Sequence, residues 1–218
     1  MLDKLKSKCI LKKIFEIIKR KRKLNIIKYN KRISFKLNIN KEDFEIYIIL
    51  KEYNKKYNTN IDDIDSKELD LNGRHIRDEG LIDLFKIEFQ EINKLDLNWN
   101  LISDINILGK INFKELQILD LSYNLISDIN ILEKVNFKIL KELSLSWNVI
   151  SDINILGKVN FKELKVLYLS YNKISDINVL EGVNFKELQI LDLSYNKISD
   201  INICEKVNFE NKGIRFKL

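Results

Sequence analysis

The segments LQILDLSYNLISDINIL (residues 116–132) and LQILDLSYNKISDINIC (residues 188–204) are nearly identical, and they lie three periods of 24 residues apart. The same pattern returns at every period between and before them, without insertions. One asparagine marks each copy: Asn100, Asn124, Asn148, Asn172 and Asn196. A fixed period of this length is typical of proteins built from stacked structural units, so the repeat determines the fold.

Each unit contains two leucines separated by one residue, as in Leu119 and Leu121. Successive side chains of a strand point to opposite faces, so both leucines are expected to face the interior. The residues between and after them are expected to face outward. A column of phenylalanines is predicted to add to the core: Phe113, Phe137, Phe161, Phe185 and Phe209.

Two polar columns follow each strand. The asparagines are predicted to be buried in a ladder, where each amide hydrogen-bonds backbone groups that the strands leave unpaired. An aspartate preceded by serine comes four residues later and is placed to cap a short helical turn. The aspartates of this column are Asp104, Asp128, Asp152, Asp176 and Asp200.

The pattern L-x-x-L-x-L-x-x-N-x-I-x-D-I-x-x-L, seen at residues 164–180, resembles the leucine-rich repeat family, with an internalin-like consensus. The resemblance implies an α/β fold, a right-handed leucine-rich-repeat solenoid with a parallel concave sheet. Residues 66–91 resemble an atypical first repeat of the ribonuclease-inhibitor type, with a full helix through Leu81, Leu84, Phe85 and Phe89. Regular repeats then cover about 92–208, and 209–218 is expected to form a degenerate last strand.

Residues 1–60 do not fit the repeat and are predicted to form a separate α-helical domain or cap before the repeat domain at 61–218. Apolar spacing indicates three helices, near residues 11–18, 24–27 and 44–48. Asn40 is placed to cap the third helix.

The charge of the chain is unevenly distributed. Residues 1–36 contain 14 Lys and Arg against only Asp3 and Glu16, whereas residues 61–218 contain 20 basic and 26 acidic residues. The formal net charge of +6 therefore conceals a basic N-terminal part and an acidic repeat part.

The composition is that of a globular chain, with 45% apolar residues and no proline. Cys9 and Cys204 form no C-x-x-C pair, so the sequence indicates neither a disulfide framework nor a zinc site. No apolar run approaches the roughly 20 residues needed to span a bilayer. We therefore expect a cytoplasmic, monomeric protein without a membrane span.

No catalytic motif is present, so we expect a protein that is not an enzyme and uses no cofactor. The lone histidine, His75, lies in a turn with no nucleophile beside it in the sequence, and no phosphate-binding or H-E-x-x-H motif occurs. The repeated aspartates supply one carboxylate per unit, whereas calcium needs six or more oxygen ligands at one place. We interpret these aspartates as helix caps and expect no metal site.

The candidate contact surface is the outward face of the strands, where a stacked array presents side chains in regular rows. The positions after the leucine pairs hold Asn98, Ser122, Ser146, Ser170 and Ser194. The positions between the leucines hold Asp96, Asp120, Ser144, Tyr168 and Asp192. Beside the asparagines runs the aromatic row of Trp99, Tyr123, Trp147, Tyr171 and Tyr195.

Aromatic side chains provide large contact area at low entropic cost, so the sequence predicts a protein partner of unknown identity on the aromatic row and the column between the leucines. The rings are expected to form a ridge along one edge of the sheet, about 5 Å apart. In the alternative interpretation, each ring only stacks on the next unit and shields the turn.

Two alternative functions concern the N-terminal part. Residues 10–18 faintly resemble the F-box, which implies a substrate adaptor of a ubiquitin ligase, although the Leu-Pro opening of that module is missing. The basic stretch 12–36 is also typical of binding to nucleic acid or an anionic surface. The apolar residues of this stretch are spaced like those of a helix face buried in a core, however, so we do not expect nucleic-acid binding.

Overall fold

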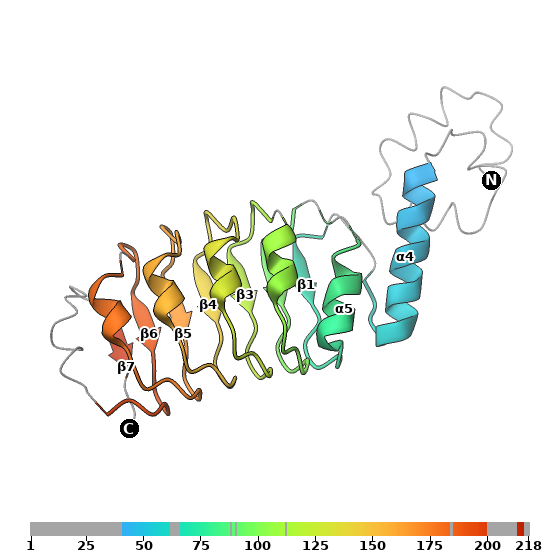
Figure 1. Ribbon diagram of the computed structural model, residues 1–218. Helices are drawn as coiled ribbons and strands as arrows, with labels where there is room; N and C mark the ends of the chain where they lie inside the picture. Colours follow the sequence, from blue (N-terminus) through green and yellow to red (C-terminus); the bar gives the residue numbers. More distant parts are fainter. Residues whose placement is uncertain are drawn as a thin grey trace, which may run out of the picture.

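The computed structural model describes residues 41–61, 66–87, 89, 91–111, 113–183, 185–199 and 213–215. These residues form an elongated array of stacked coils with one helix at its N-terminal end (Figure 1). That helix is α4 (Lys41–Tyr57), in the place where the sequence predicts a third helix. The two earlier predicted helices, Asn40 and the F-box-like segment lie outside the described residues.

Seven short strands form one parallel sheet in chain order, as the repeat predicts. They are β1 (Glu68–Asp70), β2 (Lys94–Asp96), β3 (Ile118–Asp120), β4 (Glu142–Ser144), β5 (Val166–Tyr168), β6 (Ile190–Asp192) and β7 (Gly213–Arg215). Equivalent residues pair across the regular units, for example Leu95 with Leu119. The last strand, β7, lies in the segment predicted to hold a degenerate strand.

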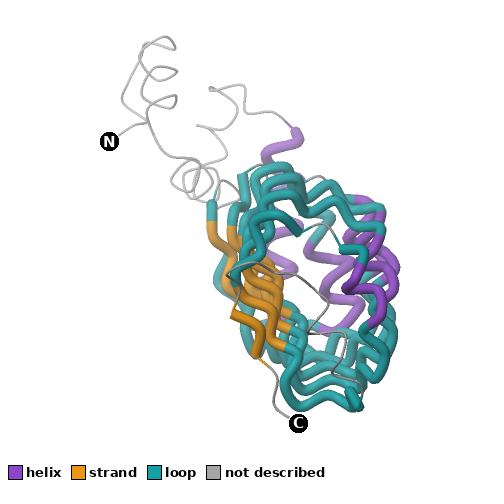
Figure 2. The backbone as a smooth tube through the Cα atoms, turned by 90° about the vertical axis from the view of Figure 1, so that its left-hand side faces the viewer, coloured by secondary structure: helices purple, strands orange, loops and turns teal. Residues whose placement is uncertain are grey.

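Helical segments occupy the side of the solenoid opposite the strands (Figure 2). In the first unit this segment is α5 (Arg77–Leu84). The four units that begin with β2 to β5 each have one turn of 3-10 helix: η2 (Asn106–Lys110), η3 (Asn130–Glu133), η4 (Asn154–Gly157) and η5 (Asn178–Glu181). The solenoid fold that the sequence predicts is confirmed.

The interior between these two sides is apolar. Both leucines of each pair are buried, and so are the phenylalanines at 113, 137, 161 and 185. Phe209 lies outside the described residues. The same core continues into α4 through Leu50 and Tyr53, so this helix closes the N-terminal end of the core.

The asparagine column links neighbouring units through the backbone. The amide of Asn148 donates to Leu121 O in the preceding unit and to Leu145 O in its own unit, both at 3.0 Å. Its Oδ1 accepts from the N–H of Ile126 in the preceding unit at 2.9 Å. Each described asparagine of the column repeats this bridging pattern, so one side chain satisfies buried groups of two units.

The aspartate column lies one residue before the predicted place of a helix cap: the N-cap residues of the helical turns are isoleucines that make no side-chain cap hydrogen bond, and each described aspartate accepts the first N–H of the turn instead. Asp104 Oδ1 accepts the N–H of Asn106 at 2.7 Å, and Asp152 does the same for Asn154 at 2.8 Å. The carboxylate stands two residues before the N–H it accepts, so the contact is an Asx turn that leads into the helix. Asp128 and Asp176 make the equivalent contact, whereas Asp200 lies outside the described residues.

The first unit departs from the prediction of a full helix through Phe89. Helix α5 has eight residues and ends at Leu84, with Phe85 as its C-cap. Phe89 is buried, but it lies beyond the helix. The apolar spacing is nevertheless correct, because Leu81 and Leu84 are fully buried. Apolar periodicity identified the buried positions but not the end of the helix.

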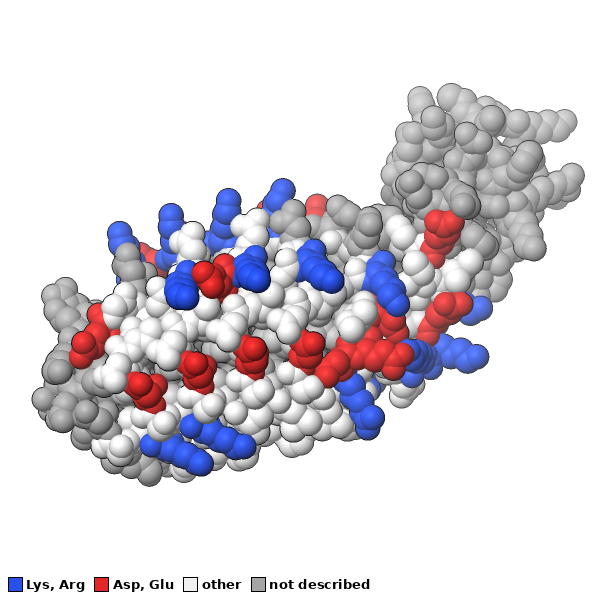
Figure 3. All heavy atoms as spheres, in the orientation of Figure 1, with Lys and Arg blue, Asp and Glu red and all other residues white. Residues whose placement is uncertain are grey.

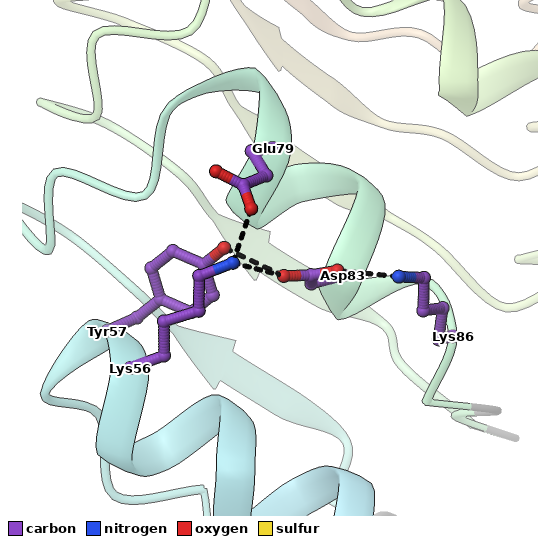
Figure 4. Close-up of polar contacts among 5 residues, drawn as sticks. All are labelled: Lys56, Tyr57, Glu79, Asp83 and Lys86. Carbon is purple, nitrogen blue, oxygen red and sulfur yellow. Dashed lines mark hydrogen bonds and ion pairs between the residues drawn. The ribbon is translucent and has the colours of Figure 1, made fainter.

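A polar cluster joins α4 to α5 (Figure 4). Lys56 Nζ lies 3.0 Å from Asp83 Oδ2, and the Tyr57 hydroxyl donates to the same oxygen at 2.8 Å. Lys86 Nζ lies 2.7 Å from the other oxygen, and Lys56 also pairs with Glu79. Burial raises the pKa of Asp83, but hydrogen bonds from Lys86, Lys56 and Tyr57 outweigh it and lower the pKa to about 2.

In the described residues, no helix is long and apolar enough to cross a membrane.

Replacing Asn148 with Ala is expected to lower the free energy of unfolding by about 1 to 3 kcal/mol, because it leaves buried backbone groups unpaired in two units. Chemical denaturation measures the change. Asn154, exposed at the start of η4, provides the matched Asn→Ala control and is expected to change stability little. Equal losses for the two variants contradict the bridging role.

Replacing Asp83 with Asn is expected to lower stability at pH 6 more than at pH 2. A carboxylate whose folded pKa lies below its unfolded value of about 3.9 stabilises the fold above that value, and the contribution disappears as pH falls toward about 2. Denaturation of both proteins between pH 6 and 2 provides the comparison. A stability difference that stays constant over this range contradicts the assignment.

Candidate functional site

Strands β1 to β6 each end in a turn that contains a residue with left-handed backbone. In the five regular units this residue belongs to the aromatic row, with φ between 53° and 57°. In the first unit it is Gly73, with φ of 65°. At the turn positions from Gly73 to Tyr171, the backbone N–H donates to a carbonyl of the next unit, for example from Gly73 to Asn98 O and from Trp147 to Ser170 O. Gly73 is thus the structural equivalent of the five aromatic residues.

Left-handed backbone costs about 1 to 2 kcal/mol for residues other than glycine. Glycine is the residue that suits this turn best, and the first unit uses it. The five later units carry Trp or Tyr instead, so the aromatic side chain must offset the backbone cost or serve another purpose. Because Trp and Tyr both occur here, the retained property is aromaticity rather than one residue type.

The five rings form one continuous stack along the sheet edge, which confirms the predicted ridge. Centroids of neighbouring rings are 4.4 Å apart for Trp99 and Tyr123, 5.0 Å for Tyr123 and Trp147, 3.8 Å for Trp147 and Tyr171, and 4.1 Å for Tyr171 and Tyr195. The interplanar angles are 10° to 16°. Each pair contributes about 0.5 to 1.5 kcal/mol beyond area burial, which is comparable with the backbone cost.

The stacked rings stay accessible to a partner along their edges. Trp147 is covered on both faces by Tyr123 and Tyr171, yet 42% of it remains exposed. Ring edges carry the positive end of the aromatic quadrupole, and Tyr and Trp add O–H and N–H donors. The aromatic row therefore presents an apolar surface with hydrogen-bond donors.

Leu101 and Leu125 widen this apolar surface at the N-terminal end of the row, and sequence reasoning missed both. Each follows an asparagine of the column, and half of Leu125 is exposed. The sequence did contain a signal for them. The residue after the column asparagine is leucine in the first two regular units, Leu101 and Leu125, but lysine in the last two, Lys173 and Lys197. Exposed apolar residues in a continuous strip indicate an interaction surface better than scattered ones do.

The predicted exposure of the serines after the leucine pairs is wrong. Ser122, Ser146, Ser170 and Ser194 are buried, because small side chains on strands about 4.8 Å apart are covered by their neighbours. The hydroxyls of three of them pair between units, Ser146 with Ser170 at 2.9 Å and Ser122 with Ser144, whereas the Ser194 hydroxyl donates to Asp192 at 2.6 Å. Ser144, a predicted contact residue, is only 8% exposed and so offers little contact area.

The other predicted residues between the leucines, Asp96, Asp120, Tyr168 and Asp192, are partly exposed. Each aspartate accepts the N–H two residues onward, at 3.1 Å for Asp96, 2.8 Å for Asp120 and 3.0 Å for Asp192. Burial raises the pKa of Asp96, and the neighbouring carboxylates Asp120 and Asp70 raise it further. The start of the sheet thus has a negative potential.

The face that carries the helical segments differs from the start of the sheet. On this face a row of acidic side chains runs along the solenoid between basic side chains (Figure 3). Alternating rows give no extended field of one sign. In the part of the chain that the structure describes, no cluster of His, Cys, Asp or Glu could hold a metal ion. His75 is exposed in the first turn, with left-handed backbone.

Comparison with known proteins agrees with this architecture. Residues 140–182 and 162–206 match the family model described as Leucine Rich repeats (2 copies). No curated protein sequence matches the chain.

Several solved structures have similar folds. An internalin C2 from Listeria monocytogenes is 21% identical, with a TM-score of 0.51, and the match covers 78% of this chain and 92% of that one. An internalin (inlF) from the same organism is 28% identical over 64% of this chain, with a TM-score of 0.49, and the match spans 37% of its length. A leucine-rich repeat protein of Leptospira interrogans is 23% identical, with a TM-score of 0.46, over 62% of this chain and 39% of its own.

The family match lies within the regular units, and those units share one period, one strand register and one asparagine bridge from residue 92 onward. The internalin C2 structure has the same fold. Residues 140–206 thus match the leucine-rich repeat family, and the described repeat units have the solenoid fold.

Proposed function

We propose that this chain is a non-enzymatic scaffold that binds a protein partner through the aromatic row and the outer face of its sheet. Leucine-rich repeat proteins generally mediate interactions between proteins. The partner-binding residues of this proposal are the five aromatic residues, with Asp96, Asp120, Ser144, Tyr168 and Asp192 beside them.

The observation that carries the proposal is the aromatic row itself. Five rings occupy a turn where glycine costs less, and three of them, Trp99, Trp147 and Tyr195, are more than 40% exposed. Stability alone does not require so much exposed ring surface. Trp and Tyr are also the residues on which binding energy concentrates in protein interfaces.

The sheet beside the row supports a protein partner in particular. The partly exposed positions of the strands hold both apolar or aromatic side chains and carboxylates: Ile118, Val166, Tyr168 and Ile190, and Asp96, Asp120 and Asp192. The surface therefore mixes acidic and apolar side chains along the solenoid. An extended surface with both characters fits a folded protein or a long peptide better than a small molecule.

The double variant Trp147→Ala with Tyr171→Ala is expected to weaken partner binding by at least about 2 kcal/mol, or roughly 30-fold, because it removes the centre of the stack. Immobilised full-length chain captures the partner from the native cell, and titration with the purified partner gives the affinities. Alanine keeps a side chain at the left-handed position, so the backbone cost changes little.

Lys162→Ala is the control, because Lys162 is exposed and lies outside the row and the strands. We expect its affinity to match that of the unmodified chain. If the aromatic residues are only structural, the double variant unfolds at lower denaturant while its folded fraction binds with unchanged affinity. That result refutes the proposal.

A further inference from the structure

The aromatic stack ends at Trp99. One face of this indole packs on Tyr123, with 4.4 Å between centroids and 12° between planes. The opposite face points toward the preceding unit, where the equivalent residue is Gly73, which has no side chain. A Cβ atom added to Gly73 meets no other atom within 4 Å, so the space above it is open.

The exposure of the rings agrees with an open indole face. Trp99 is 54% exposed, whereas Trp147, which has a ring on each side, is 42% exposed. Along the described stack, Trp99 is the ring beside which the preceding unit supplies no aromatic partner. A planar group of suitable size can therefore continue the stack over Gly73.

Two carboxylates lie on the two strands that lead to Gly73 and Trp99. Asp70 and Asp96 pair in register on β1 and β2, and each lies three residues before the turn position, Gly73 or Trp99. Asp70 Oδ1 accepts the N–H of Asn72 at 3.0 Å, and Asp96 Oδ1 accepts that of Asn98 at 3.1 Å. These contacts orient both carboxylates toward the end of the strands where the indole lies, and they occupy only one oxygen of each.

Two basic residues, Arg74 and Lys94, also belong to this part of the chain. Arg74 follows Gly73, and its Nη1 donates to Asn58 O at 3.2 Å, directly after the end of α4. Lys94 acts on Asp96 more weakly than burial and the carboxylates of Asp120 and Asp70 do. The opening thus combines a bare aromatic face with two carboxylates on the adjoining strands.

We propose that the open face of Trp99, together with Asp70 and Asp96, is a subsite for an arginine side chain of the protein partner. Guanidinium is planar, stacks on an aromatic face and donates to carboxylates through a fork of N–H groups. Lysine shares the charge but not the planar shape, and a neutral aromatic ring shares the shape but not the charge. The subsite rests on the proposed function and specifies one element of the partner.

The test uses fluorescence, because the chain contains only two tryptophans. In the full-length variant Trp147→Phe, Trp99 is the sole tryptophan, and phenylalanine preserves the stack. Titration with acetyl-tetra-arginine amide is expected to change the emission of Trp99 and to bind at least about tenfold more tightly than acetyl-tetra-lysine amide.

Gly73→Tyr in this background closes the opening with a sixth ring, and we expect it to abolish the preference for arginine. Lys162→Tyr adds the same ring elsewhere on the surface and is expected to preserve the preference. If Gly73→Tyr does not fold, judged by circular dichroism, the pair Asp70→Asn with Asp96→Asn gives a second test. This pair should reduce tetra-arginine affinity at least about tenfold.

Equal affinities for the arginine and lysine peptides overturn the proposal, because they indicate attraction of charge alone. A neutral tyrosine-containing tetrapeptide that binds as tightly as tetra-arginine overturns it as well. Either failure leaves the proposed function intact if the Trp147 and Tyr171 double variant still loses the captured partner, so the two claims are tested separately.

Discussion

The bridge that each buried asparagine makes between two units is the interaction on which this solenoid depends. A strand of three residues forms few hydrogen bonds, and the chain leaves it by turning into an apolar interior. Without a polar partner there, backbone groups of two coils are buried and unpaired. The Asn148 side chain donates to both coils and accepts from Ile126, which fixes the turn and the register together.

The aromatic row follows from this constraint. To direct the asparagine inward, the residue before it adopts left-handed backbone, which places its side chain at the sheet edge, one per unit. Because the units are in exact register, neighbouring rings stack at 3.8 Å to 5.0 Å. A requirement of the backbone thus produces a regular surface, and the choice of Trp or Tyr over glycine makes that surface available for recognition.

Features that repeat with the period could be predicted from the sequence, since the same environment recurs in every unit. The buried leucines and the asparagine bridges belong to this group. Features that depend on close contacts between side chains of neighbouring units could not be predicted from the sequence. Alternation on a strand predicts exposed serines, but Ser146 and Ser170 cover each other. The open space above Gly73 could not be predicted either. It becomes evident only when the backbone shows that Gly73 occupies the same turn position as the aromatic residues, because no aromatic residue marks that position in the sequence.

Amide hydrogen exchange of the asparagine-bound N–H groups tests the central claim most directly. Asparagine side chains accept the N–H groups of Ile102, Ile126, Ile150 and Ile174, which lie outside the strands. We predict that these four amides exchange as slowly as that of Leu119 within β3, and that Asn148→Ala accelerates exchange chiefly at Ile126. Exchange of all four at the rate of exposed loop amides in the unmodified protein would contradict the account.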